Sequence, residues 1–227
     1  MIRALAFDFD GLIIDTETPL IDAWAALHER AGRAYSRADA HRIVGHVEVA
    51  FDPWAAFGPD ADRAALETEH RRLSRELTAL QPILPGVLAG LQEARTRGLK
   101  LAVASNSSHE HVDRHLTRLG LRPLFDLACC REDVAAGKPA PDLYHLVIRR
   151  LGLVPSEAIA FEDSTAGTLA ARAAGLWTVA VPNPSTHHHD FSAAHLVLPS
   201  LADMPLAQLL DRFATAPRNG AGDSARV

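Results

Sequence analysis

The chain has 227 residues, 48% of them hydrophobic and 22% charged, which is typical of a globular protein that buries a substantial core. A formal net charge of -5 excludes the basic field that would gather nucleic acid or an anionic membrane. No apolar run approaches the roughly 20 residues of a membrane helix, and no secretion signal precedes the first apolar segment, so we expect a cytoplasmic protein. The only cysteines, Cys129 and Cys130, are adjacent and predict buried apolar side chains instead of a disulfide.

The first apolar segment ends in two acids. Leu5–Phe7 predicts a buried strand of a parallel sheet, and Gly11 allows a sharp turn after it. Alternation along an extended chain places the side chains of Asp8 and Asp10 on the same side. Because neighbouring carboxylates repel each other, we expect a divalent cation, a shared proton or a lysine to lie close to them. An ordinary acidic turn is the alternative for this stretch by itself.

Residues 16–80 predict helices without a strand between them. Thr16 or Thr18 can cap the first helix, and the apolar stripe that includes Trp24 predicts packing inside this helical segment. The expected segments are a helix that reaches Arg30 or Ala31, a helix over Arg37–Val44, an irregular aromatic loop over His46–Asp60, and a charged helix from about Asp62 to Leu80.

From Pro85 onward, apolar strands alternate with helical segments, which is typical of a parallel sheet covered on both faces. We therefore predict an α/β fold, with a Rossmann-like parallel sheet core that carries helices on both faces, and a small α-helical cap. Residues 1–15 and 82–214 form the predicted core domain, residues 16–81 the cap, and residues 215–227 a disordered tail. The expected strands are Lys100–Ala104, Phe125–Cys130, Ala158–Phe161 and Trp177–Val181, and the expected helices are Val87–Arg97, Glu110–Leu119, one that runs through Arg150, Thr165–Ala174 and one past Pro205.

Polar side chains follow these strands at the point where each strand ends. Because parallel strands end at one edge of the sheet, we expect these side chains to converge. A phosphate ester needs an in-line nucleophile, a proton donor for the leaving oxygen, cations and hydrogen-bond donors, and the set contains each of them. Its members are Asp8, Asp10, Ser105, Asn106, Lys138, Glu162 and Asp163.

Each of these residues also has a purely structural alternative. Ser105 can cap the following helix, Lys138 can be a solvated loop lysine, and Glu162 with Asp163 can be an acid pair at a helix N-terminus. Their joint occurrence favours a site. The run His187–His189 suggests a metal tract, but no further ligand spacing accompanies it, so a solvated loop is the favoured interpretation.

Four motifs carry a resemblance to a known family. Asp8–Thr16 (DFDGLIIDT), Ser105–Ser107, Gly137–Pro139 and Glu162–Ser164 resemble, in order and spacing, the motifs of the haloacid dehalogenase-like hydrolase superfamily. The helical block after the first strand is similar to the cap of the β-phosphoglucomutase-like subfamily. The resemblance covers the chain from about Ile2 to Val181.

The resemblance implies a role for each matching residue. Asp8 would be the nucleophile and a Mg²⁺ ligand, and Asp10 the general acid, then the general base, which also offers the metal its backbone carbonyl. Asp163 would complete the protein ligands, and Glu162 would stand behind them or reach the ion through water. The expected groups for the phosphoryl oxygens are Ser105, the Asn106 amide and Lys138.

The cap decides between water and a sugar as the phosphoryl acceptor. Leu20 and Glu48 stand where sugar-phosphate mutases of the subfamily carry a histidine and a phosphate-binding arginine. We therefore expect a monomeric Mg²⁺-dependent phosphatase of small phosphomonoesters, such as sugar or related metabolite phosphates. A phosphosugar mutase and a non-catalytic phosphometabolite-binding protein are the alternatives. The expected specificity surface, with the cap interior as its alternative, is Val44–Glu48 with Phe51, Trp54 and Phe57. Arg71, Arg72 and Arg75 are expected to face solvent, with a position folded towards the cleft as the alternative.

Overall fold

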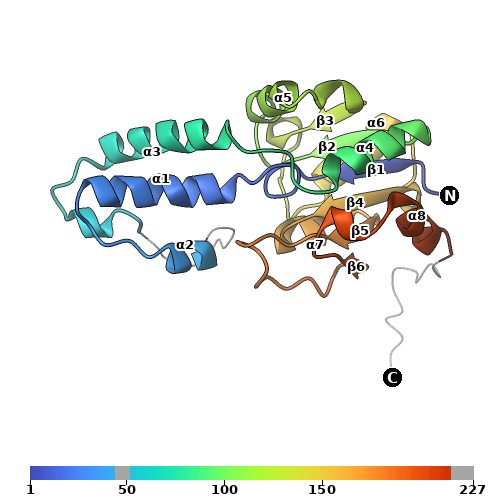
Figure 1. Cartoon of the computed structure of the whole chain (residues 1–227). Coiled ribbons are helices and arrows are strands. Elements are labelled where there is room, and N and C mark those ends of the chain that lie inside the picture. Colours follow the sequence, from blue (N-terminus) through green and yellow to red (C-terminus); the bar gives the residue numbers. More distant parts are fainter. Residues whose placement is uncertain (44–51, 216–227) are drawn as a thin grey trace.

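The computed structural model describes residues 1–43 and 52–215. Six strands form one parallel sheet in the order β3-β2-β1-β4-β5-β6, so β1 lies in its centre (Figure 1). The predicted α/β fold with a parallel sheet is confirmed. The strands are β1 (Ala4–Phe7), β2 (Lys100–Ala104), β3 (Leu127–Cys129), β4 (Ala158–Glu162), β5 (Trp177–Ala180) and β6 (Leu196–Val197).

Eight α-helices occur in the described part of the chain, and none of them is long and apolar enough to cross a membrane. The prediction missed β6, which has two residues and therefore shows no period, and it placed the start of β3 two residues too early. The helices are α1 (Glu17–Arg30), α2 (Arg37–Ile43), α3 (Arg63–Thr78), α4 (Val87–Thr96), α5 (His109–Arg118), α6 (Asp142–Leu151), α7 (Thr165–Ala173) and α8 (Leu206–Thr215).

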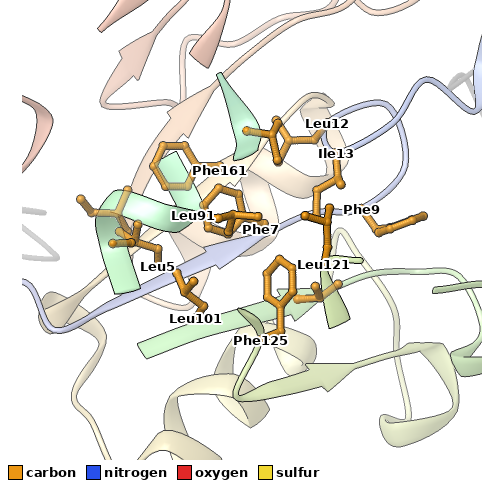
Figure 2. Packing of buried hydrophobic residues seen from close by; sticks show 14 of the residues in the cluster. Leu5, Phe7, Phe9, Leu12, Ile13, Leu91, Leu101, Leu121, Phe125 and Phe161 are labelled. Atoms are coloured by element: carbon orange, nitrogen blue, oxygen red, sulfur yellow. The ribbon is translucent and has the colours of Figure 1, made fainter. Parts of the chain in front are cut away.

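Alternation along β1 divides the core between the two faces of the sheet. Leu5 and Phe7 point to one face, where they belong to one apolar cluster with side chains of α4, α5 and α8. Figure 2 shows both residues with Leu91 of α4. Phe7 stacks on Phe161 of β4 with ring centroids 4.7 Å apart. Ala4 and Ala6 point to the other face, and their small side chains leave room for α6 and α7. This packing fixes the positions of the carboxyl ends of β1 and β4 at the edge of the sheet.

The register of the sheet sets the positions of the acids. Phe7 pairs with Phe161, and the backbone N–H of Asp8 still donates to the Phe161 carbonyl at 3.0 Å. One residue further, Asp8 and Glu162 therefore leave the sheet at the same level. Ser105 follows β2 at the same edge, with its N–H donating to the Cys129 carbonyl at 3.0 Å.

Helices α1, α2 and α3 lie together beyond this edge of the sheet (Figure 1). Helices α1 and α3 share a small apolar cluster that contains Leu27, Trp54 and Leu73, and Trp24 stacks on His70 at 4.7 Å. Trp54 is therefore part of the interior of this segment, and its predicted place on a specificity surface is wrong. The expected residues Val44–Glu48 and Phe51 lie outside the described residues, as does the tail beyond Thr215. The division into two domains stays a prediction.

The first helix is capped by a different residue from the one expected. Asp15 Oδ1 accepts from the N–H groups of Glu17 and Thr18, at 3.1 and 2.9 Å, whereas Thr16 makes no side-chain capping bond. The Thr16 side chain interacts with Asp10 instead and lowers the pKa of that carboxyl group. A threonine before a helix caps that helix only where its hydroxyl does not interact with another group.

Candidate active site

Three buried carboxylates meet at the edge of the sheet. Asp8, Glu162 and Asp163 each offer an oxygen within 4.8 Å of the others, and each is less than a tenth exposed. Asp8 and Glu162 come from neighbouring strands, and Asp163 follows at the turn into α7. The structure thus brings together two of the predicted metal ligands and the acid that was expected behind them.

Lys138 lies inside this carboxylate cluster. Its Nζ is 3.0 Å from Asp8 Oδ1 and 2.6 Å from Glu162 Oε1, and its side chain is 3% exposed. The alternative of a solvated loop lysine is therefore wrong. Asn106 fixes the Lys138 backbone, because its Oδ1 accepts from the Lys138 N–H at 2.8 Å and its Nδ2 donates to the Lys138 carbonyl at 3.1 Å. The side-chain amide of Asn106 is thus engaged in placing the lysine.

The carboxylate cluster carries more negative charge than Lys138 can offset. Burial, followed by the charge of Asp8, raises the pKa of Asp163 well above its usual range. Burial and the charge of Asp8 also raise the pKa of Glu162 to about 8, although Lys138 acts against them. A further cation would relieve this repulsion, and hard carboxylate oxygens are the ligands that Mg²⁺ prefers. The residues present therefore fit a magnesium ion.

Two glycines make room for the acids. A Cβ on Gly167, in the first turn of α7, would collide with the Glu162 carboxylate. A Cβ on Gly11 would collide with Asp163, and the backbone of Gly11 has a φ of +76°, which also favours glycine. Tyr144 completes the surroundings, because its hydroxyl donates to Glu162 Oε1. At both turns, the absence of a side chain therefore allows the backbone to lie directly against a carboxylate.

Asp10 lies beside the carboxylate cluster and belongs to a separate network. The Ser107 hydroxyl donates to its Oδ2 at 2.6 Å, and His111 Nε2 is 2.9 Å from its Oδ1. Burial raises the pKa of Asp10, but the hydrogen bond and charge of His111 and the bond from Ser107 outweigh burial and leave this pKa below its usual value. Ser105 Oγ is 3.4 Å from Asp10 Oδ2 and accepts from the Ser107 N–H at 2.9 Å.

The structural alternative for Ser105 is wrong, since the cap of α5 is Ser108. Ser108 Oγ accepts from the N–H of His111 at 3.3 Å and stands directly before the helix. Ser105 comes three residues earlier, at the end of β2, where its hydroxyl is fully buried beside Asp10. Ser105 therefore lies next to the acid that follows β1, at the edge of the sheet where the carboxylates meet.

Sequence reasoning missed four residues that contact the acids. Tyr144 and His111 gave no signal, since a tyrosine or histidine on a helix does not show which way it points. Ser107 belongs to the quoted motif Ser105–Ser107 but was given no role of its own. Asn183 did give a signal, because it follows β5 as the other site residues follow their strands. Its Nδ2 donates to Asp163 Oδ2 at 2.7 Å and to the Gly11 carbonyl at 3.2 Å.

A cleft of about 410 Å³ opens from Asp10 between α3 and α5. Arg71, Arg72 and Arg75 are all exposed, as predicted, and Arg71 and Arg75 also line this cleft, whereas Arg72 does not. The cleft is large enough for a small metabolite.

The first two residues of the histidine run, His187 and His188, lie on the surface, and His187 Nδ1 is 2.7 Å from the Pro184 carbonyl.

The raised pKa values of the buried acids predict how stability varies with pH when no divalent cation is present. Between about pH 4.5 and pH 8, folded Glu162 keeps a proton that the unfolded chain has released, so the free energy of unfolding falls as pH rises through this window. We expect the Tm in EDTA to fall over this range. Added MgCl₂ should raise the Tm more at pH 8 than at about pH 5. A Tm in EDTA that rises steadily to pH 8 would contradict this account.

Comparisons with known proteins agree with this geometry. Residues 2–175 match the family model of haloacid dehalogenase-like hydrolases. The chain is 37% identical to YhcW of Bacillus subtilis over 217 residues, which cover 94% of this chain and 98% of YhcW. It is 32% identical over 177 residues to the phosphorylated carbohydrates phosphatase of Thermotoga maritima, covering 77% and 82% of the two chains.

The fold is also similar to solved structures. CbbY from Rhodobacter sphaeroides, in complex with phosphate, superposes with a TM-score of 0.70 at 28% identity, covering 89% of this chain and 96% of CbbY. Together the comparisons confirm the predicted superfamily and the predicted class of enzyme, a phosphoric monoester hydrolase. The chain belongs to the haloacid dehalogenase-like hydrolase family.

Proposed function

We propose that this protein is a Mg²⁺-dependent phosphatase that hydrolyses small phosphomonoesters of sugars or related metabolites through an aspartyl-phosphate intermediate. The observation that carries the proposal is the position of Asp8, whose carboxylate lies 3.0 Å from the Lys138 ammonium and within a cluster that holds Asp163. The naming of the Thermotoga maritima relative for phosphorylated carbohydrates supports the substrate class. Residues 16–81 would act as a cap over the site.

In the first half-reaction, Asp8 is the nucleophile. Both the Phe9 N–H, at 2.7 Å, and Lys138 contact its Oδ1, which holds the carboxylate in one orientation. One carboxylate oxygen attacks phosphorus, the ester P–O bond breaks, and Asp10 gives a proton to the departing alkoxide. Lys138 offsets charge on the phosphoryl oxygens, and Ser105 with the backbone N–H of Asn106 donates to them.

In the second half-reaction, Asp10 is the base. It takes a proton from water, the water oxygen attacks phosphorus, and the bond to Asp8 breaks to release inorganic phosphate. Asp8, Asp163 and the backbone carbonyl of Asp10 would hold Mg²⁺, which when bound neutralises charge on the phosphoryl group. Glu162 and Asn183 would keep Lys138 and Asp163 in place.

The test is release of phosphate from a panel of phosphometabolites, measured with Mg²⁺ and with EDTA. We expect turnover only with the metal. Glucose 1-phosphate with a catalytic amount of the 1,6-bisphosphate separates hydrolysis from transfer, because a mutase makes glucose 6-phosphate and a phosphatase makes free phosphate. Isomerisation with negligible phosphate release would show that the protein is a mutase and not a phosphatase. Full activity in EDTA would refute the proposed dependence on Mg²⁺.

The contact between His111 and Asp10 predicts a dependence on the leaving group. In the described arrangement the low pKa of Asp10 favours its carboxylate form, so Asp10 has to take up a proton before it can protonate the leaving alkoxide. His111 Nε2, 2.9 Å from Asp10 Oδ1, is the contact through which we expect that proton to come. We expect His111→Ala to lower kcat about tenfold for alkyl phosphates, whose leaving groups need a proton. For p-nitrophenyl phosphate, whose leaving group needs none, kcat should change less than about threefold.

The control for this variant is His109→Ala, in the same helix. His109 bonds to Asp133 at 2.8 Å, away from Asp10, so both substrates should keep their rates. An equal loss for both substrates in His111→Ala would show that His111 supports only the fold around Asp10. In that case the proton would reach Asp10 by another route.

A further inference from the structure

Tyr144 is a fully buried side chain of α6 that carries a polar group. It belongs to the apolar cluster on one face of the sheet, together with Ala4, Ala6 and Ala160 of the strands and Val147 of its own helix. A phenylalanine would fill nearly the same space, so packing does not account for the hydroxyl. Because a buried hydroxyl costs free energy unless it forms a hydrogen bond, its partner indicates what the hydroxyl does.

Both parts of the Tyr144 side chain reach the carboxylate cluster. Its hydroxyl donates to Glu162 Oε1, and Lys138 Nζ lies over its ring, 5.4 Å from the ring centroid. Burial, followed by the charge of Glu162, raises the pKa of Tyr144 well above its usual range, so the hydroxyl keeps its proton and remains a donor. An ammonium over an aromatic ring is attracted by the negative face of the ring. One side chain therefore interacts with both members of a buried ion pair.

The hydroxyl of Tyr144 shares Glu162 Oε1 with Lys138. The Lys138 Nζ is 2.6 Å from this oxygen and 3.0 Å from Asp8 Oδ1. The other oxygen, Glu162 Oε2, accepts no hydrogen bond within the described part of the chain and lies against Gly167. A second donor on Oε1 takes up part of its charge and weakens the attraction between Glu162 and Lys138. Lys138 is therefore held between Asp8 and Glu162 and not by Glu162 alone.

We propose that Tyr144 is a positioning residue for Lys138. Its hydroxyl offsets part of the charge of Glu162 and its ring attracts the ammonium, so that Lys138 stays close enough to Asp8 to offset charge on the phosphoryl oxygens. Without the hydroxyl, Lys138 would be the only donor to Glu162 Oε1 and would be drawn toward it, away from Asp8. This inference rests on the proposed phosphatase function and adds a residue to its site.

The kinetic test compares Tyr144→Phe with Tyr35→Phe, since the chain contains two tyrosines. Tyr144→Phe keeps the ring and removes only the hydroxyl. We expect kcat for p-nitrophenyl phosphate with Mg²⁺ to fall about tenfold and KM to change less than about twofold, because Lys138 acts on charge that develops in the transition state. Tyr35 lies in the helical segment with its ring 4.7 Å from that of His28, so Tyr35→Phe should change neither constant. A lower Tm with an unchanged kcat in Tyr144→Phe would show that the hydroxyl serves only the fold, and would overturn the proposal.

A double-mutant cycle shows whether Tyr144 acts through Glu162. Glu162→Gln removes the charge that the hydroxyl offsets, so the addition of Tyr144→Phe in that background should change kcat less than about twofold. The same tenfold loss in both backgrounds would show that the hydroxyl acts on another group, and the proposal would then be wrong.

Lysine NMR tests the position of Lys138 without metal and without turnover. Because the sequence contains only two lysines, full-length protein with ¹³C-labelled lysine gives two Cε signals, and Lys100, 57% exposed, is the reference. In EDTA, Tyr144→Phe should move the Lys138 signal, and by more than it does in the Glu162→Gln background, while Tyr35→Phe should move neither signal.

This measurement separates the inference from the function on which it rests. A Lys138 signal that stays in place in Tyr144→Phe, in a wild type that turns over with Mg²⁺, refutes the role of Tyr144 and leaves the phosphatase intact. A signal that moves as expected, in a wild type without turnover, supports the position of Lys138 and refutes the phosphatase alone.

Discussion

Asp8→Asn is expected to abolish phosphate release, with a loss of at least about a thousandfold in kcat, while the protein stays folded. A neutral amide cannot attack phosphorus to form the acyl phosphate on which the reaction depends. The variant should also gain stability in EDTA, because burial and the charge of Asp10 raise the pKa of Asp8 in a cluster already crowded with acids. Phosphate release and the Tm in EDTA measure the two effects.

Asp60→Asn is a suitable control for Asp8→Asn. Asp60 is an exposed acid in the loop before α3, so its replacement should change neither rate nor Tm by much. Near-normal turnover in purified Asp8→Asn would show that another group is the nucleophile. A Tm in EDTA well below that of the wild type would show that the negative charge of Asp8 stabilises the fold, contrary to the repulsion inferred from its surroundings.

Lys138→Met is expected to cost both activity and stability. Lys138 is the cation that contacts Asp8 and Glu162, and removal of one partner from a buried ionic network leaves uncompensated charge, which costs roughly 3–5 kcal/mol. We expect kcat/KM to fall at least about a hundredfold, since the phosphoryl oxygens also lose their neutralising charge. Denaturant unfolding in EDTA and steady-state kinetics measure the two losses.

The sequence offers a close control, because it contains only two lysines. Lys100 lies at the start of β2 with a side chain that is 57% exposed, 3.7 Å from Asp126. Lys100→Met should therefore change the free energy of unfolding by less than about 1 kcal/mol and leave kcat/KM unchanged. Equal effects of the two substitutions would show that burial of Lys138 has no energetic consequence. Excess Mg²⁺ should recover part of the stability of Lys138→Met, since both cations offset the same acids.

Prediction from the sequence was most successful where the signal is local. The period of apolar residues located β2 over Lys100–Ala104 and α4 from Val87, and the expected parallel sheet is confirmed. Prediction was weaker where a structure depends on tertiary contacts. The two-residue β6 exists because it pairs with β5, which lies well before it in the chain. Thr16 interacts with Asp10 instead of capping α1, and this contact forms only because the chain turns between the two residues.

The sequence by itself determined which residues stand at the carboxyl ends of the strands, because strand ends are marked by local changes from apolar to polar residues. The tertiary structure alone decided which of these groups touch. It joined Lys138 to both Asp8 and Glu162, placed Asp10 on His111 and Ser107, and brought Asn183 to Asp163. It also turned Arg75 toward the cleft and Arg72 away from it. The helical period shows which side of α3 is apolar. It does not show which polar residues of α3 turn toward the cleft, because this depends on how α3 packs on α1 and faces α5. Residues far apart in the chain make those contacts.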